Sequence, residues 1–472
     1  MTLVRFGVAA GTPLAPDEAY YWVWSRVLQP GYLDDSPMVA LWIRVGTLLA
    51  GASPLGVRLL GPVAAAAGSF LIYRAAGDFF PERPGTGLTA AGLLNATLLF
   101  GVGSVIMTPD TPLLFFWGLG LFALARLAAS GDGRWWLLAG LAGGLALDSK
   151  YTGLLFLAAV GLWLLASRDA RRWLGRPEPW LGLGLAFLVF LPVVVWNGLN
   201  HWASFAKQGG RVGAWHPAEA VRFQAELWGG QVGLFTPLVF LLVAAGSWRM
   251  AARALREGAP AGILLSLLTL LPAAVFVQHA FGGRVQGNWP AVLYPSAVLA
   301  GAWLAGRPWE GLRVPAMALG LAISGFVYLQ ALAAPFPLPP GLDPSLRELG
   351  GWSALATRVG ALGREDGAQF LAVHDYGTAA EMAFLGRGPQ PVVGAARRWR
   401  FFRLPAAAPV IGGRSGLLLL RRGRGSPDAR LWGVLAPPIA LVRARRGVAA
   451  EAYLLYRVRA RRGVPGVILP GR

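Results

Sequence analysis

Residues 180–199 read WLGLGLAFLVFLPVVVWNGL, a run of twenty residues without a charged side chain. A helix of this length extends about 30 Å, which matches the hydrocarbon core of a bilayer. The composition agrees, because 55% of the 472 residues are hydrophobic and only 14% are charged. A soluble domain is usually about a quarter charged. The run therefore predicts a transmembrane helix and an all-α polytopic membrane protein, not a barrel of short strands.

Nine further apolar segments predict spans of the same kind. They are 57–77, 87–106, 111–129, 134–148, 152–167, 231–248, 260–281, 289–305 and 313–334. Residues 2–14 are too short to cross a bilayer and lack a signal-peptide pattern. We expect them to be the end of a truncated first span, which gives about eleven spans in total. Residues 38–51 include Arg44 and are also short, which favours an interfacial or re-entrant helix.

Two short loops, 168–179 and 249–259, are the richest in arginine. The positive-inside rule places such loops in the cytoplasm. If residues 38–51 do not cross, all the unusual polar segments fall on the opposite face. These segments are APDEAYYW, MTPDTP, DSKYTG, WNGLNHWASFAKQGGR and GGRVQGNWP. We therefore expect a multi-pass protein of the cytoplasmic (inner) membrane with an active site on the extracytoplasmic side.

The region from Pro335 onward differs in composition. It is less apolar, begins within a proline-rich linker at 332–344, and holds 21 arginines against 8 carboxylates. A helix-like segment at 350–363 and strand-like segments at SGLLLLRR and EAYLLYRV predict a small α/β domain over 335–472, outside the cytoplasm, beside a membrane domain at 1–334. No nucleic-acid-binding motif accompanies the net charge of +20, so a solvated surface or anionic membrane lipid explains it better than nucleic acid. The chain has no cysteine, which excludes disulfides and thiolate metal sites.

The outer segments supply the candidate acids and aromatic rings. Asp17 and Glu18 open the first outer loop, and Asp110 lies between two spans. Carboxylates at a membrane boundary are costly unless they are hydrated or paired. We predict catalytic roles for the three, although a solvated loop and a helix N-cap are the simpler alternatives. Tyr20 and Tyr21 fit either a sugar-stacking wall or an interfacial aromatic belt.

The outer segments also carry the only two lysines of the chain, Lys150 and Lys207. Cations beside an apolar groove suit a lipid phosphate, whereas snorkelling to the interface is the alternative for Lys150. A histidine in a loop is more often structural than catalytic. The further predicted substrate contacts are Asp34, Tyr151, Asn197, His201, Arg211, Asn288 and Trp289.

Five ordered segments between about residues 15 and 305 carry a family resemblance. They are PDEAYYWVWSR with GYLDDSPMVALW, TPDTPLLFFWGLGLFAL, GLALDSKYTGLLF, PVVVWNGLNHWASFAKQGGR and QGNWPAVLYPSAVLAG. Together they resemble the GT-C membrane glycosyltransferases, and among these the bacterial family 39 group related to protein O-mannosyltransferases and lipid A aminoarabinose transferases. The segment FLAVHDYGTAAEMAFLGRG is similar to the extracytoplasmic domain of that family.

The resemblance implies an enzyme that transfers a sugar from a polyprenyl-phosphate donor to a hydroxyl of a lipid, glycan or protein acceptor, with inversion. Asp17 matches the proposed general base and Asp110 the second outer-loop acid. Asp35 and Ser36 depart from the pattern, because a basic residue or histidine followed by two prolines is usual there. Gln286 stands where an acid is common. No cofactor is certain, and a divalent metal is left open.

Two rival functions remain at this point. A polytopic lipid or sugar transporter would also have many spans, but transporters tend to show an internal repeat and helices broken in mid-span, and no repeat is visible. A catalytically dead scaffold that binds polyprenyl lipid is the other rival, against which Asp17 and Asp110 argue. No nucleotide-binding motif is present, so a donor used outside the cytoplasm would have to be lipid-linked.

Overall fold

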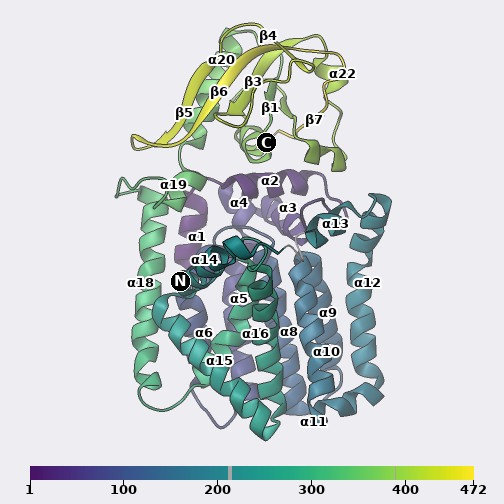
Figure 1. Cartoon of the computed structure of the whole chain (residues 1–472), viewed down its shortest axis with the longest axis vertical. Helices are drawn as coiled ribbons and strands as arrows, with labels where there is room; N and C mark the ends of the chain where they lie inside the picture. The colour runs from purple at the N-terminus through teal and green to yellow at the C-terminus, as the bar shows by residue number, and fades with distance from the viewer. Residues whose placement is uncertain (211–214, 389, 472) are drawn as a thin grey trace. The chain divides into compact units, whose positions relative to one another are not determined.

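The computed structural model describes residues 1–210, 215–388 and 390–471 (Figure 1). The chain forms two compact units that interleave along the sequence. The first contains Met1–Arg5, Pro30–Val39 and Leu60–Phe326, and the second contains Phe6–Gln29, Ala40–Leu59 and the chain from Val327 onward. The boundary expected near residue 335 stays a prediction. Each unit is described by itself below.

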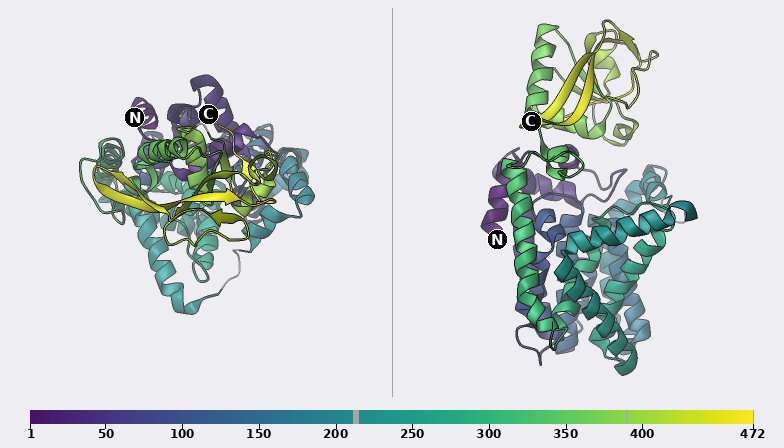
Figure 2. Two further views of the ribbon diagram at one scale, coloured as in Figure 1. Left: turned by 90° about the horizontal axis from the view of Figure 1, so that it is seen from above. Right: turned by 60° about the vertical axis from the view of Figure 1, so that its left-hand side comes forward.

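The first unit is helical, as the hydropathy predicts (Figure 2). Its helices are α5 (Leu60–Phe79), α6 (Thr86–Ala96), α7 (Leu98–Gly103), α8 (Asp110–Ser130), α9 (Trp135–Ser149), α10 (Leu154–Ala166), α11 (Arg168–Arg171), α12 (Pro177–Leu199), α13 (Ala203–Gly209), α14 (Pro217–Phe235), α15 (Pro237–Glu257), α16 (Pro260–His279) and α17 (Tyr294–Trp303). Three 3₁₀ turns, η1 (Tyr151–Gly153), η2 (Arg172–Gly175) and η3 (Trp289–Leu293), separate some of them. Helices α1 (Thr2–Gly11), α3 (Met38–Ala50) and α18 (Trp309–Ala333) contribute residues to both units.

Among the described residues, six helices are long and apolar enough to cross a membrane. They are Pro54–Phe79, Asp110–Ser130, Pro177–Leu199, Pro237–Glu257, Pro260–His279 and Trp309–Ala333. The stretch from Tyr151 to Gly175 adds a seventh if its two helices, bent by 101°, are taken as one span. The chain is therefore a polytopic helical membrane protein, and residues 38–50 form the short helix expected of them.

The described helices include fewer long spans than the eleven predicted, because several apolar stretches are divided. The predicted span 231–248 is broken, since α14 ends at Phe235 and α15 begins at Pro237. Proline lacks an amide hydrogen and favours the first turn of a new helix. The predicted span 87–106 is interrupted at Thr97, whose side chain accepts a hydrogen bond of 3.2 Å from the Phe100 amide and so caps α7. Hydropathy alone does not detect either break.

Small residues let α9 pack closely against its neighbours. A Cβ atom added at Gly140 would lie 2.0 Å from the carbonyl oxygen of Gly182 on α12. One added at Gly144 would lie 2.8 Å from the Cα atom of Ala186. Such close contacts are typical of helix pairs in membranes. They fix the end of α9, after which Lys150 follows directly.

The second unit contains a seven-stranded mixed sheet (Figure 1). Its strands are β1 (Leu371–Val373), β2 (Val392–Gly394), β3 (Ser415–Arg421), β4 (Trp432–Val434), β5 (Ile439–Arg445), β6 (Val448–Ala460) and β7 (Val467–Ile468). The order is β4-β6-β3-β1-β2-β7, with β5 paired to β6. Strand β1 is parallel to both β2 and β3, and the remaining pairs are antiparallel. The carboxyl ends of these three strands therefore meet at one edge.

Helices complete the second unit. They are α2 (Pro16–Arg26), α4 (Pro54–Arg58), α19 (Pro344–Leu349), α20 (Trp352–Glu365), α21 (Tyr376–Leu385) and α22 (Ala408–Ile411), with the 3₁₀ turn η4 (Arg397–Phe401). Helix α2 packs against α21, where Trp22 meets Phe384 edge-on with ring centroids 5.1 Å apart. The helix predicted at 350–363 and the strands predicted around SGLLLLRR and EAYLLYRV are present as α20, β3 and β6. A small C-terminal α/β sheet domain is thus confirmed.

Candidate active site

The first unit brings together three of the predicted residues around Asp110. This residue begins α8, and Lys150 follows the end of α9, so the packing of these two helices places the side chains at the same end. The Lys150 Nζ atom lies 2.7 Å from Asp110 Oδ1, and Asn288 Nδ2 donates to Asp110 Oδ2 at 2.6 Å. The side chains of Lys150 and Asp110 are 13% and 10% exposed. The pair is therefore largely desolvated but still open to a ligand.

A second ion pair joins Asp34 to Lys207 of α13. Gln208 Nε2 also donates to the carbonyl oxygen of Asp34 at 2.6 Å. The two lysines of the chain thus each contact a carboxylate that the sequence predicts for the site. Lysine presents a compact, strongly hydrated point charge, which suits a phosphate that arrives and leaves.

Asp35 interacts electrostatically with members of both pairs, namely Lys150, Asp110 and Asp34. The sequence identified it only as a departure from the family pattern. The pKa of Asp35 is raised to about 7, mainly by burial and to a smaller extent by the charges of Asp110 and Asp34. The charge of Lys150 and the Ser36 amide, which donates to Asp35 Oδ1 at 3.0 Å, act in the opposite direction. With this pKa the Asp35 carboxyl is partly protonated near neutral pH. It occupies the position where the family usually has a basic residue or histidine.

Tyr151 and Asn197 hold the segment that carries Lys207. The hydroxyl of Tyr151 shares a hydrogen bond of 2.8 Å with Ser204, and Asn197 Oδ1 accepts from the Phe205 amide at 3.2 Å. These contacts fix the start of α13. Their role in the described structure is to position the lysine segment, and direct contact of either side chain with substrate stays a prediction.

The remaining predicted residues of the first unit lie in the loops. His201 is exposed and has a left-handed backbone conformation with φ of 57°. Trp289 packs edge-on against His279, with ring centroids 5.5 Å apart. Asn288 is placed by the buried Gln231, whose Nε2 atom donates to the carbonyl oxygen of Gly287 at 2.9 Å. Arg211 lies outside the described residues.

In the second unit, Asp17 and Glu18 are neighbours with opposite surroundings. Asp17 is exposed, and its Oδ1 atom accepts a hydrogen bond of 2.8 Å from the Tyr376 hydroxyl. Glu18 is fully buried and forms an ion pair of 2.5 Å with Arg58. Its Oε2 atom also accepts from the Ala15 amide at 2.9 Å, which caps the start of α2.

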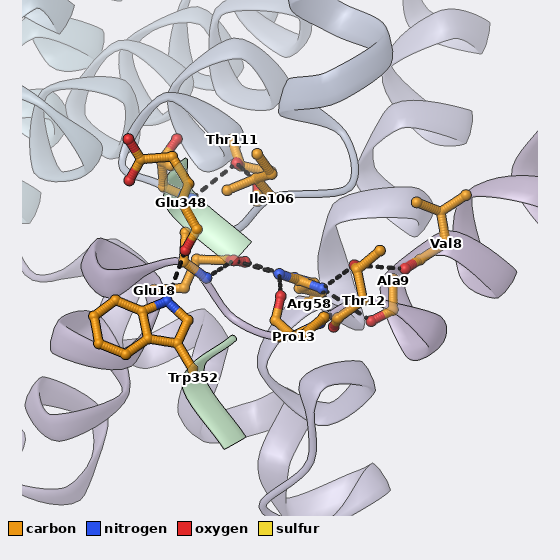
Figure 3. Close-up of polar contacts among 12 residues, drawn as sticks. Val8, Ala9, Thr12, Pro13, Glu18, Arg58, Ile106, Thr111, Glu348 and Trp352 are labelled. Carbon is orange, nitrogen blue, oxygen red and sulfur yellow. Dashed lines mark hydrogen bonds and ion pairs between the residues drawn. The ribbon is translucent and has the colours of Figure 1, made fainter. Parts of the chain in front are cut away.

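Figure 3 shows how completely Arg58 is engaged. Besides both oxygens of Glu18, its guanidinium donates to the carbonyl oxygens of Ala9, Thr12 and Pro13 and to the Thr12 hydroxyl, at 2.7–3.1 Å. Buried Glu381 lies in the same region. Burial raises its pKa well above the usual range, and the charge of Glu18 raises it further, while Arg443 and Arg58 lower it. This is a dry, structural polar network.

Tyr20 and Tyr21 are also neighbours that differ in burial. Tyr20 is 2% exposed, and its ring packs against Tyr376 at 4.7 Å and Trp399 at 5.3 Å. Tyr21 is half-buried beside Trp24, with centroids 5.0 Å apart. Tyr20 therefore packs inside an aromatic cluster of the second unit, and contact of either tyrosine with substrate stays a prediction.

Sequence reasoning missed three contributors, namely Arg58, Tyr376 and the proton-carrying character of Asp35. An arginine within an apolar stretch signals a buried partner, so Arg58 could have been flagged. Nothing local marks Tyr376, because 359 residues separate it from Asp17. Among the described residues, no group of three or more His, Cys, Asp or Glu side chains is arranged to hold a metal ion.

Three comparisons with known proteins bear on the class. Residues 34–196 match the family model described as dolichyl-phosphate-mannose-protein mannosyltransferase. Lipid A galacturonosyltransferase RgtD from Rhizobium johnstonii is 28% identical over 377 residues, covering 78% of this chain and 76% of the relative. The crystal structure of ArnT from Cupriavidus metallidurans bound to undecaprenyl phosphate matches with a TM-score of 0.64 at 16% identity, over 96% of both chains. Its apo structure gives a TM-score of 0.61.

The ArnT match establishes the fold, which is that of the GT-C membrane glycosyltransferases. The family model and the related sequence agree with it, and so do the ordered motifs. The chain is accordingly a membrane glycosyltransferase of the GT-C type, as the resemblance implied.

Proposed function

We propose that this protein transfers a sugar from a polyprenyl-phosphate-linked donor to an acceptor hydroxyl on the extracytoplasmic side of the cytoplasmic (inner) membrane, with Asp17 as the general base. The observation that carries the proposal is the polar cluster of the first unit. There both lysines of the chain form ion pairs with carboxylates, Lys150 with Asp110 and Lys207 with Asp34. The ArnT structure with bound undecaprenyl phosphate supports a donor of this class.

The reaction requires one proton transfer and one substitution. Asp17 takes the proton of the acceptor hydroxyl while its oxygen attacks the anomeric carbon of the sugar. The bond from that carbon to the phosphate oxygen breaks, and the polyprenyl phosphate leaves with one more negative charge than the donor had. General-base catalysis of this kind contributes roughly 10²–10⁴-fold.

Lys150 and Lys207 would stabilise the charge that develops on the leaving phosphate. Fixed cations directed at developing charge lower the barrier most in a poorly hydrated site. Asp110 and Asn288 hold Lys150 in place before the donor arrives, and Asp34 does the same for Lys207. In this account Asp110 is a positioning residue for the phosphate side of the reaction.

Asp17 is suited to the base role by its exposure and by the Tyr376 hydroxyl, which orients one of its carboxylate oxygens. Glu18 has the opposite character, because both of its oxygens are engaged and no water reaches it. We assign Glu18 to positioning α2. The proposal requires Asp17 and Asp110 to face one cavity, which stays a prediction from the sequence.

For the acceptor we favour a glycolipid over a protein, because the related sequence from Rhizobium acts on lipid A. Lipid analysis of a deletion strain tests the function as a whole. The deletion strain should accumulate a polyprenyl-phosphate sugar and contain a shortened envelope glycolipid. The wild-type gene and Asp132→Asn should reverse both changes, whereas Asp17→Asn should reverse neither. An unchanged lipid profile in the deletion strain would contradict the proposal.

Sidedness is tested separately. A topology reporter fused after Gly258, in the loop between α15 and α16, should report the cytoplasm, and one fused after Gly341 should report the opposite side. The same side for both fusions would contradict the extracytoplasmic site.

A further inference from the structure

An apolar groove lies among α9, α10, α12 and α16 of the first unit (Figure 1). Its volume is about 600 Å³, and its lining includes Leu155 and Leu165 near the two ends of α10. The helix rises about 15 Å between these two residues. This length is half of the roughly 30 Å thickness of a hydrocarbon core. The groove therefore has the depth of one leaflet, which suits the acyl chain of a membrane lipid.

Tryptophan side chains mark one end of the groove. Trp180 Nε1 donates to the carbonyl oxygen of Leu174 at 3.0 Å, and both residues belong to the lining. Trp136 also lines the groove, and its ring meets that of Trp173 with centroids 6.0 Å apart. Tryptophan is enriched where a membrane protein crosses the headgroup level. This end of the groove is therefore expected to lie beside the lipid headgroups.

Arginines are held at the same end. Arg171 Nε donates to the carbonyl oxygen of Leu165 at 2.7 Å. The guanidinium groups of Arg172 and Arg176 each lie 5.7 Å from the ring centroid of Trp173. All three arginine side chains are exposed. The planar fork of arginine matches the geometry of a phosphate, so this end of the groove can receive a phosphate group.

The charge at this end stays positive when the carboxylates of all three adjoining loops are counted. Loops 131–134, 167–179 and 253–260 meet here, because Glu178 packs against Gly133 and Trp163 Nε1 donates to the Pro260 carbonyl oxygen at 2.9 Å. The loops contain seven arginines and four carboxylates. Three of the carboxylates form ion pairs within the loops, namely Asp132–Arg134, Glu178–Arg176 and Glu257–Arg253. The excess of arginine favours an anionic ligand over a zwitterionic one.

We infer that this groove and its arginines bind an anionic phospholipid, with an acyl chain along α10 and the phosphate at Arg171 and Arg172. The positive-inside rule assigns loop 168–179 to the cytoplasm, and basic pockets between helices on that side bind anionic headgroups. Trp136 lies at the start of α9, whereas Lys150 follows its end. The lipid headgroup and the candidate active site are thus at opposite ends of α9, and the inference does not depend on the proposed reaction.

Photocrosslinking tests the inference on the intact protein. The full chain is placed in phosphatidylcholine nanodiscs with a trace of a diazirine-tailed probe, either phosphatidylglycerol or phosphatidylcholine, and labelled residues are identified by mass spectrometry. The phosphatidylglycerol probe should label Leu162 and Leu165 roughly tenfold more than the phosphatidylcholine probe does, the effect of one charge-assisted contact. The two probes should label Val314 and Leu319 equally, because these exposed residues of the spanning helix α18 lie outside the groove.

Two results of this experiment would overturn the inference. One is equal labelling of the groove by both probes. The other is displacement of the phosphatidylglycerol probe by polyprenyl phosphate but not by unlabelled phosphatidylglycerol, which would assign the groove to a prenyl chain.

Variants test the role of the arginines. Arg171→Gln/Arg172→Gln should abolish the preference for phosphatidylglycerol, whereas Arg171→Lys/Arg172→Lys, which keeps the charge, should retain most of it. Unchanged labelling of the groove by the phosphatidylcholine probe shows that the groove itself is intact. The matched control is Arg74→Gln/Arg307→Gln, which removes two exposed arginines outside the lining and should leave the preference unchanged. A preference that survives in Arg171→Gln/Arg172→Gln, or that is lost equally in the control, would contradict the assigned site.

Discussion

Two carboxylate–cation pairs of the same chemical kind differ in how far they are buried. They are Glu18–Arg58 in the second unit and Asp110–Lys150 in the first. Glu18 and Arg58 are 0% and 1% exposed, and the guanidinium is surrounded by protein acceptors on all sides. Asp110 and Lys150 keep 10% and 13% exposure, and the cation is a lysine. Saturation with internal partners marks the first pair as structural. Residual access marks the second as able to exchange a partner for a ligand.

The largest expected effect concerns the neighbours Asp17 and Glu18. Asp17→Asn keeps the side-chain size and removes the base, so kcat should fall by roughly 10²–10⁴-fold with unchanged thermal stability and donor affinity. Glu18→Gln should instead lower stability. The measurement is sugar transfer in detergent together with thermal unfolding, with Asp132→Asn as the exposed control. Near-normal turnover of folded Asp17→Asn would remove Asp17 from the base role.

The structural pair is tested by Arg58→Met, which leaves Glu18 buried without its cation. Breaking a buried pair in this way costs about 3–5 kcal/mol. The double variant Glu18→Gln/Arg58→Met should recover part of that loss, because no uncompensated charge remains. Arg134→Met, at a pair that is mostly solvent-exposed, should cost at most about 1 kcal/mol. If Arg58→Met were no worse than Arg134→Met, the distinction between the pairs would fail.

A smaller effect is expected from Asp35. Its pKa of about 7 in the folded protein lies above that of an unfolded aspartate. The folded state therefore binds the proton more tightly, and stability should fall as the pH rises from about 4 to 7 and level off above that range. Unfolding midpoints of wild type and Asp35→Asn across this pH range measure it, and parallel curves would contradict the assigned pKa.

Much of the fold could be predicted because its signals are local. The run at 180–199 forms α12, and the segment at 350–363 forms most of α20. The breaks at Thr97 and Thr236 were missed, since capping and a helix-starting proline leave hydropathy almost unchanged. The sheet order was also beyond prediction, because pairing depends on contacts between distant segments.

The candidate site shows the same division. Asp110, Lys150 and Asn288 were each predicted from their loops, and the structure joins them by direct hydrogen bonds. The partners Glu18–Arg58 and Asp17–Tyr376 could not be paired from the sequence, since 40 and 359 residues separate them. Residue type and loop membership identify candidates, whereas burial and partner count decide which of them are free to do chemistry.

The central claim is that Lys150 and Lys207 of the first unit, which are both partly exposed, bind the phosphate of the donor. The most direct test is equilibrium binding of purified polyprenyl phosphate to the wild type, Lys150→Ala and the control Arg134→Ala, all in the same detergent. Loss of a charge-assisted contact predicts an increase in Kd of roughly 10–100-fold for Lys150→Ala, with no change for Arg134→Ala and with the fold retained. Wild-type affinity in folded Lys150→Ala would contradict the claim.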